Sequence, residues 1–325
     1  MIDFAVIIPT RSRPQFVGGA VESVLRQTHP AREVVVVRDG PEAVVPDSLP
    51  RDLVRVLDRP AEGVAAARNA GIAATSAEWL CFLDDDDLWH PERLSAISDH
   101  IESRPGCAAA HAGWWSFSAT RAASVDLVAT SLEECLEQAA HVTPVSSMAY
   151  LEITGRSFDL LLERNRTAIS TVTVRRDVLE RAGGFPHGYT CAEDWVMAIN
   201  VARYTEWQYC GRRLSFIRKH PGNNTTSNPT NDLVTIRAIR EVWRDRTRPA
   251  PPHRDLTAYA HDYRDLVQRA VWEALGRGDV RVAAAAYAVG REILPRHRDR
   301  AVSLIPPQLM RRIVRARARR AQQSR

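Results

Sequence analysis

Four consecutive aspartates, Asp84 to Asp87, directly follow an apolar run at 79–83. Adjacent carboxylates repel one another, so a run of four is costly unless something cationic lies among them. Mg²⁺ or Mn²⁺ is the natural partner, because hard cations prefer oxygen ligands and often hold substrate phosphates as well. A solvated acidic turn is the alternative, but the position after a buried strand favours a metal and phosphate site.

Two further polar segments follow apolar runs in the same way. Thr10, Arg11 and Arg13 come after the first run, and Asp39 ends the second. In open parallel sheets, ligands bind outside the carboxyl ends of the strands. We therefore expect these segments and the four aspartates to share one crevice if their strands are neighbours. Arg11, Arg13 and Arg68 are suited to a diphosphate, because a guanidinium group donates forked hydrogen bonds.

A further acidic pair, Glu193 and Asp194, begins a segment with helical spacing. Carboxylates are favoured at the start of a helix, which gives this pair a purely structural explanation. A general base is the functional alternative. Position in the sequence leaves both interpretations open.

Alternating strands and helices are predicted to hold these residues over the first 105 positions. The strand runs are apolar and uninterrupted, which is typical of a parallel sheet covered by helices on both faces. We expect strands at 4–8, 34–37, 54–57 and 79–83, and helices at 16–25, 64–74 and 91–101.

The chain becomes less regular after residue 105 and entirely helical towards its end. We expect strands at 168–174 and 207–217, helices at 177–182, 193–204, 255–276, 279–293 and 307–321, and a linker at 247–253. These patterns predict an α/β domain over 1–230, with halves at about 1–105 and 106–230, followed by a helical region over 231–325.

The composition is that of an ordinary globular protein, with 45% hydrophobic and 26% charged residues. No apolar run has the roughly 20 residues that a membrane span needs, and the first residues lack a secretory signal pattern. The five cysteines are scattered without a Cys-x-x-Cys pair, which argues against structural zinc and disulfides. We therefore expect a cytoplasmic protein.

The basic charge is concentrated at the end of the chain. Ten arginines and a single acid, Asp299, lie within 296–325, whereas the whole chain has a net charge of +5. Arginines surround an apolar stripe that contains Leu309 and Ile313, so 306–325 is a candidate for contact with an anionic membrane at its inner face. A docked helix with a basic end is the alternative. We expect no nucleic acid partner, because the tail lacks interleaved aromatic residues.

Seven motifs, in order, resemble those of bacterial family 2 glycosyltransferases. They lie at 6–11, 35–40, 63–71, 82–91, 172–176, 183–185 and 192–195, and the resemblance extends over about 3–222. It implies a GT-A fold, a nucleotide-diphospho-sugar donor, a divalent cation (Mg²⁺ or Mn²⁺) and inversion at the anomeric carbon. A UDP-sugar is favoured. The acceptor would be a saccharide, a lipid-linked molecule or a small molecule.

The resemblance also implies roles for individual residues. Pro9, Thr10, Arg11 and Asp39 would hold the nucleoside, with Asp39 on the base and Arg68 near the base or diphosphate. Asp84 to Asp86 match the Asp-x-Asp motif of the family, with Asp84 and Asp85 binding the donor and Asp86 the metal. Asp194 matches the catalytic base, with Glu193 beside it. His220 resembles a loop histidine that approaches the metal or diphosphate. Arg38 departs from the family, which often has an acid there.

Two other functions are compatible with parts of this pattern. A nucleotidyltransferase has a similar sheet but usually a glycine-rich loop after the first strand, which 9–14 lacks. A binding protein that has lost catalysis would not need Asp84, Asp86 and Asp194 together. Trp114, Trp115 and Tyr150 could stack on an acceptor sugar or belong to the core.

Overall fold

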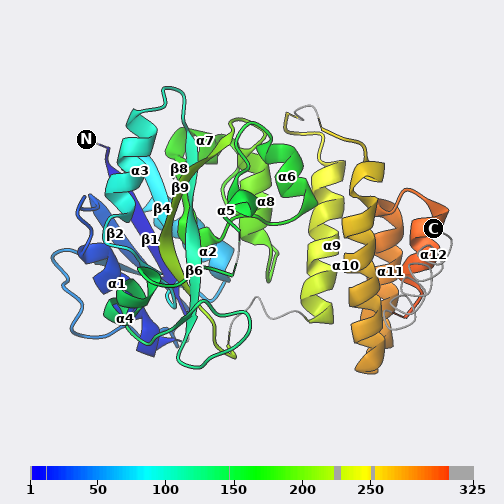
Figure 1. Ribbon diagram of the computed structural model, residues 1–325, viewed down its shortest axis with the longest axis horizontal. Helices are drawn as coiled ribbons and strands as arrows, with labels where there is room; N and C mark the ends of the chain where they lie inside the picture. Colours follow the sequence, from blue (N-terminus) through cyan, green and yellow to red (C-terminus); the bar gives the residue numbers. More distant parts are fainter. Residues whose placement is uncertain (1, 12, 146, 223–227, 250–252, 307–325) are drawn as a thin grey trace. The chain divides into compact units, whose positions relative to one another are not determined.

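The computed structural model of the protein describes residues 2–11, 13–145, 147–222, 228–249 and 253–306. The chain forms two compact units (Figure 1). The first comprises Met1–Leu161, Asn165–Tyr189 and Glu193–Asn223, and the second Leu162–Arg164, Thr190–Ala192 and Asn224–Arg325. The last part of the second unit thus begins at 224, seven residues before 231, where the sequence analysis places the start of the helical region.

One mixed sheet is the centre of the first unit, and within the described residues it has nine strands. Eight follow the order β3-β2-β1-β4-β8-β6-β9-β5, and β7 pairs with β6. The strands are β1 (Phe4–Thr10), β2 (Glu33–Asp39), β3 (Arg55–Arg59), β4 (Trp79–Phe82), β5 (Leu88–Trp89), β6 (Ala109–Ser118), β7 (Leu127–Val128), β8 (Val172–Arg175) and β9 (Trp207–Arg218).

Strands β1 to β4 form a parallel half of the sheet, as predicted, whereas β5, from the same part of the chain, is antiparallel to β9. β1 pairs in parallel with both β2 and β4, and β3 extends this half from β2. Beyond β4 the directions are mixed, because β8 is antiparallel to both β4 and β6, whereas β6 and β9 are parallel. The strands that end at the three polar segments are therefore consecutive in the sheet, with β1 between β2 and β4.

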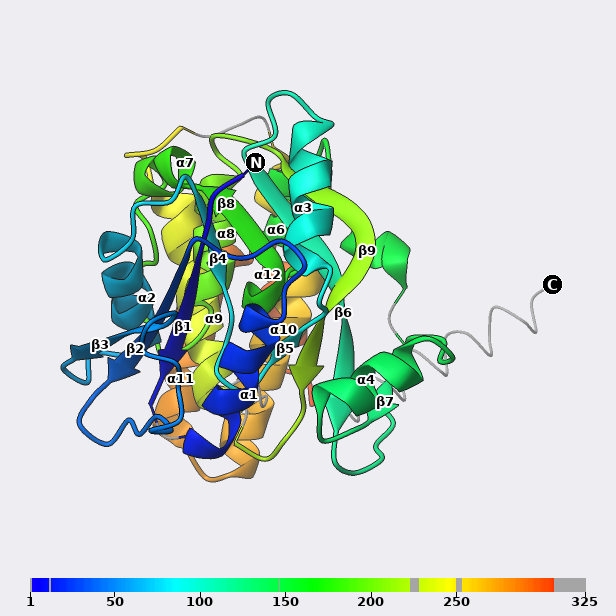
Figure 2. The same cartoon turned by 90° about the vertical axis from the view of Figure 1, so that its left-hand side faces the viewer.

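Helices cover both faces of this sheet, with α1 and α3 on one face and α2 on the other (Figure 2). In chain order the helices are α1 (Pro14–Leu25), α2 (Val64–Ala73), α3 (Arg93–Glu102), α4 (Leu132–Ala139), α5 (Met148–Leu151), α6 (Ser157–Glu163), α7 (Arg176–Arg181), α8 (Glu193–Val201), α9 (Pro229–Arg244), α10 (Leu256–Gly276), α11 (Val280–Ile293) and α12 (His297–Ser303).

Alternate residues of β1 pack into the two helical layers, because successive side chains of a strand point to opposite faces. Phe4, Val6 and Ile8 join a buried cluster with residues of α1 and α3. On the opposite face, Ile7 lies against α2. A Cβ atom on Gly71 would lie 2.5 Å from a methyl carbon of Ile7, so only glycine allows α2 to approach the sheet this closely.

The second unit is helical, with α9 to α12 packed together. Asp232 of α9 accepts two hydrogen bonds from Arg269 of α10, at 2.8 and 2.9 Å. Tyr259 and Tyr263 of α10 stack with their ring centroids 5.8 Å apart. The sequence predicts α10 and α11 but not α9 or α12, and the helix predicted at 307–321 lies outside the described residues.

Two further predictions differ from the structure. The strand expected at 168–174 begins later, because Ile169–Thr171 form a 3-10 turn before β8. The sequence analysis also missed β6, the long strand between β8 and β9. All five cysteines are free, as expected. Among the described residues, no helix combines the length and apolar character required to cross a membrane.

Candidate active site

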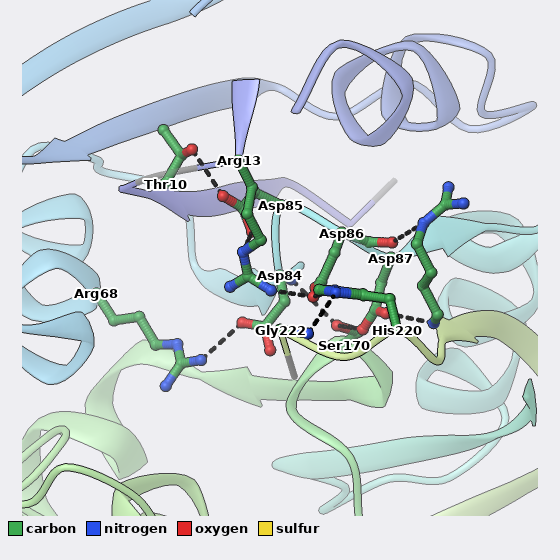
Figure 3. Close-up of polar contacts among 11 residues, drawn as sticks. Thr10, Arg13, Arg68, Asp84, Asp85, Asp86, Asp87, Ser170, His220 and Gly222 are labelled. Atoms are coloured by element: carbon green, nitrogen blue, oxygen red, sulfur yellow. Dashed lines mark hydrogen bonds and ion pairs between the residues drawn. The ribbon is translucent and has the colours of Figure 1, made fainter. Parts of the chain in front are cut away.

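Polar residues from the ends of β1 and β4 meet directly at one edge of the sheet. The hydroxyl of Thr10 donates a hydrogen bond to Asp85 Oδ2 at 2.7 Å (Figure 3). Arg13, which follows β1, also pairs with Asp85, with Nε 3.1 Å from Oδ1. Burial raises the pKa of Asp85 to about 7, while the charge of Arg13 and the hydrogen bond from Thr10 act to lower it. Asp85 therefore ties the first polar segment to the run of aspartates.

The other three aspartates of the run converge. Asp84, Asp86 and Asp87 each offer a carboxylate oxygen within 4.8 Å of the others. Asp87 is fixed by a hydrogen bond from the hydroxyl of Ser170, at 2.6 Å, and another from the backbone N–H of Arg218, at 2.9 Å. Burial and its acidic neighbours raise the pKa of Asp87 well above its ordinary value.

Cationic side chains surround these carboxylates. Arg13 and His220 both contact Asp86, with His220 Nε2 3.0 Å from Asp86 Oδ2 (Figure 3). The backbone N–H of Gly222 donates to Nδ1 of His220 at 3.1 Å, so Nε2 carries the proton in the neutral ring and donates to Asp86. Arg218 donates from Nε to the carbonyl of Asp86, at 2.8 Å, and its guanidinium group lies between two phenylalanine rings, Phe16 and Phe117.

A buried arginine connects the aspartates to the acidic pair at the start of α8. Arg68 is 2% exposed. Its Nη2 lies 2.7 Å from Asp84 Oδ1, and its Nη1 lies 2.7 Å from Glu193 Oε1. The carboxylate of Glu193 is therefore engaged. Asp194 is half-buried, and burial together with Glu193 raises its pKa to about 7, while Arg68 acts to lower it.

Asp39, at the end of β2, organises the neighbouring loop. Its Oδ1 accepts hydrogen bonds from the backbone N–H groups of Glu62 and Gly63, at 2.9 and 3.1 Å. These residues precede α2, the helix that carries Arg68. The preceding residue, Arg38, pairs with Asp58 on β3 at 2.7 Å, so its side chain is held by the neighbouring strand.

A comparison with known families agrees with this geometry. Residues 5–123 match the family model described as glycosyl transferase family 2. This part of the chain belongs to glycosyl transferase family 2. An uncharacterized glycosyltransferase of Rickettsia bellii is 26% identical over 229 residues, which is 69% of this chain and 30% of that protein. The chain therefore spans about a third of the length of such curated relatives.

Solved structures of glycosyltransferases share the fold of this chain. S. aureus TarS 1-349, in complex with UDP-GlcNAc, has a TM-score of 0.55 and 15% sequence identity over 90% of this chain and 82% of that one. The mannosyltransferase PcManGT of Pyrobaculum calidifontis, in complex with GDP-Man and Mn²⁺, has a TM-score of 0.51 and 17% identity over 89% and 74%. The GT-A fold expected from the sequence is thus confirmed.

The predicted site residues are only partly brought together. Thr10, Arg13, Asp84 to Asp86, Arg68 and His220 form one network, shown in Figure 3, which extends through Arg68 to Glu193. Pro9 is buried within β1, and Arg11 pairs with Glu42 at the surface, 2.9 Å away.

Two residues of this network, Ser170 and Arg218, were not identified from the sequence. Asp87 was included only as a member of the aspartate run, without a role of its own. Ser170 and Arg218 carry no local signal, because they reach Asp87 from 83 and 131 residues away. Of the aromatic candidates, Trp115 packs against a buried cluster, and the hydroxyl of Tyr150 donates to the carbonyl of Asn165 at 2.7 Å. Trp114 is half-buried.

Proposed function

We propose that the protein transfers a sugar from a nucleotide-diphospho-sugar to an acceptor hydroxyl, with inversion at the anomeric carbon and with the help of a divalent cation. The observation that carries this proposal is the convergence of Asp84, Asp86 and Asp87 at the end of β4, linked through Arg68 to the acidic start of α8. The nucleotide sugars bound to TarS and PcManGT support the same donor class.

The carboxylate oxygens of Asp84, Asp86 and Asp87 suit Mg²⁺ or Mn²⁺, since both are hard cations that favour oxygen ligands. When bound, such a cation neutralises charge that develops on the leaving diphosphate. Asp86 is the central ligand of this proposal. His220 is better suited to orient Asp86 than to bind the ion through Nε2, because its Nδ1 already accepts a hydrogen bond from Gly222. Arg13 adds a positive charge at the same edge.

Asp194 is the general base of the proposed reaction. A single displacement needs a group that takes the proton from the attacking hydroxyl, and a carboxylate whose pKa is about 7 is well matched to this role. Glu193 is less suited, because Arg68 holds its carboxylate at 2.7 Å. Its role is to fix Arg68 and so to support Asp194.

The nucleoside would lie near Thr10 and Asp39, at the ends of β1 and β2. We favour a UDP-sugar from the family resemblance, although TarS and PcManGT bind UDP-GlcNAc and GDP-Man respectively. The acceptor is a saccharide, a lipid-linked molecule or a small molecule. Contact of 306–325 with an anionic membrane and a cytoplasmic location remain predictions.

A donor screen tests this function. Purified protein is incubated with UDP-, dTDP- and GDP-sugars, with Mn²⁺ or with excess chelator, and the products are identified by mass spectrometry. We expect release of a nucleoside diphosphate and free sugar from one donor class, only with the metal. Pyrophosphate release from a nucleoside triphosphate and a sugar phosphate would instead indicate a nucleotidyltransferase, and absence of donor binding would contradict a transferase.

A further inference from the structure

We propose that Asn69 is a positioning residue for this transfer, because it holds the backbone of Phe185 and thereby the surroundings of Arg68. The inference rests on the proposed function. It assigns to Asn69 an effect on turnover rather than on donor binding, although the residue touches none of the acidic side chains of the site.

Two hydrogen bonds define what we call the Asn69 clamp. Asn69 Oδ1 accepts from the backbone N–H of Phe185 at 3.0 Å, and Asn69 Nδ2 donates to the carbonyl of Phe185 at 2.8 Å. One side-chain amide thus satisfies both backbone groups of one residue, as a neighbouring strand would. The clamp joins α2 to a segment that lies 116 residues further along the chain.

The turn before Phe185 is shaped to admit the clamp. Gly184 has a φ of +66°, in the left-handed region that favours glycine. A Cβ atom at this position would lie 2.8 Å from Asn69 Oδ1, closer than ordinary contact allows. Glycine is therefore required at 184 both by the backbone conformation and by the approach of the Asn69 amide.

Phe185 connects the clamp to the acidic residues of the site through its packing contacts. Its side chain is fully buried and packs edge-on against Phe82, with ring centroids 4.9 Å apart. The guanidinium carbon of Arg68 lies 5.2 Å from the centroid of the Phe185 ring. Phe82 is the last residue of β4, two positions before Asp84, the partner of Arg68. Side-chain contacts and the covalent chain therefore connect these residues in a ring, in the order Asn69, Phe185, Phe82, Asp84 and Arg68.

Loss of the clamp should therefore disturb Arg68 and, through it, Glu193 and Asp194. Small misplacements of catalytic groups can reduce rates by as much as about 10²-fold. The donor-side contacts of Thr10 and Asp39 do not involve Phe185, and those of Asp39 lie at the start of α2, before Asn69. We expect Asn69→Ala to lower kcat by about tenfold or more while KM for the donor changes by less than about threefold.

Arg176 provides a matched control, because this residue of α7 contacts the C-terminal end of α2. Arg176 donates hydrogen bonds to the carbonyls of Ile72 and Ala77, both at 3.0 Å, and so anchors the C-terminal end of α2. Arg176→Met removes two backbone contacts, as Asn69→Ala does, but none that reaches Phe185. If Asn69 only stabilised the fold, both variants would have a lower Tm and neither would have a lower kcat. We expect only Asn69→Ala to lose kcat.

The test combines steady-state kinetics with hydrogen exchange measured by mass spectrometry. Asn69→Ala should accelerate exchange in 183–195, whereas Arg176→Met should not. Gly184→Ala places a Cβ atom against Asn69 Oδ1 and should therefore also disrupt the clamp. If Asn69→Ala does not fold, Gly184→Ala is the second variant, and it should show the same loss of kcat and the same faster exchange. Wild-type kcat and exchange in Asn69→Ala, or an equal loss of kcat in Arg176→Met, would overturn the inference. An inactive wild-type protein would overturn the proposed function instead, and exchange would then decide whether the clamp holds 183–195.

Discussion

Replacement of Arg68 by methionine tests how the acidic residues are held together. Methionine retains much of the apolar stem but removes the charge that lies 2.7 Å from both Asp84 and Glu193. Arg68 is 2% exposed, so the two carboxylates lose a partner that water replaces poorly. Removal of one member of a buried ion pair costs about 3–5 kcal/mol. At about 2–4 °C per kcal/mol for a domain of this size, Tm should fall by roughly 6–20 °C.

Thermal unfolding by circular dichroism, without added metal, measures this effect. Arg11→Met is the matched control, because Arg11 pairs with Glu42 at the exposed surface. Such pairs contribute about 0–1 kcal/mol, so Tm should change little. The double variant Arg68→Met/Glu193→Gln removes one of the stranded charges and should recover part of the loss. If Arg68→Met unfolded within 2 °C of the wild-type Tm, an effect below ~1 kcal/mol, the reasoning would be refuted.

Three further predictions concern the base, the metal and the tail. Asp194→Asn should lower turnover by about 10²-fold or more with donor affinity nearly intact, and full activity would exclude Asp194 as the base. Because the pKa of Asp194 is raised to about 7 and the base acts when deprotonated, wild-type turnover should rise with pH and level off above about 7, and a flat profile from pH 5 to 9 would contradict this. Asp86→Ala should abolish Mn²⁺-dependent donor hydrolysis and weaken donor binding in calorimetry, whereas full wild-type activity in excess chelator would remove the metal from the proposal. Deletion of 306–325 should leave soluble donor hydrolysis largely unchanged. It should reduce binding to anionic vesicles at low salt, by about 1 kcal/mol per basic residue near the surface. If the wild-type protein does not bind such vesicles, the docked helix is favoured.

The elements that could be predicted from the sequence are those whose pattern is set locally. β1, β2 and β4 are buried on both faces, so they appear as uninterrupted apolar runs. β6 escaped prediction because Ala109–Ser118 is rich in alanine, glycine and serine, which have little preference for strands. Its conformation depends on pairing with β8 and β9, which come much later in the chain.

The candidate site shows the same division. The position of Asp84 to Asp87 at the end of a strand follows from the sequence, whereas the order of β2, β1 and β4 is known only from the structure. The partners of these residues do not follow from the sequence either. Arg68 was expected to contact the donor. In the structure its guanidinium group binds both Asp84 and Glu193, and Glu193 lies 125 residues further along the chain. Local spacing carries no information about such pairings, because they depend on how the strands pack.

The aspartate run also bears on how the chain acquires its active form. Asp86 and Asp87 receive His220 and the backbone of Arg218 from 134 and 131 residues away. Contacts of such long sequence separation require large loops to close and form slowly. The segment 5–123, which matches the family model, contains all four aspartates but neither of these partners nor Ser170. A nascent chain or a fragment ending near 123 would therefore retain Thr10, Arg13 and Arg68 but lack the partners that hold Asp87 and the His220 contact to Asp86. The complete arrangement of the four aspartates would arise only after β9 has been synthesised and has joined the sheet.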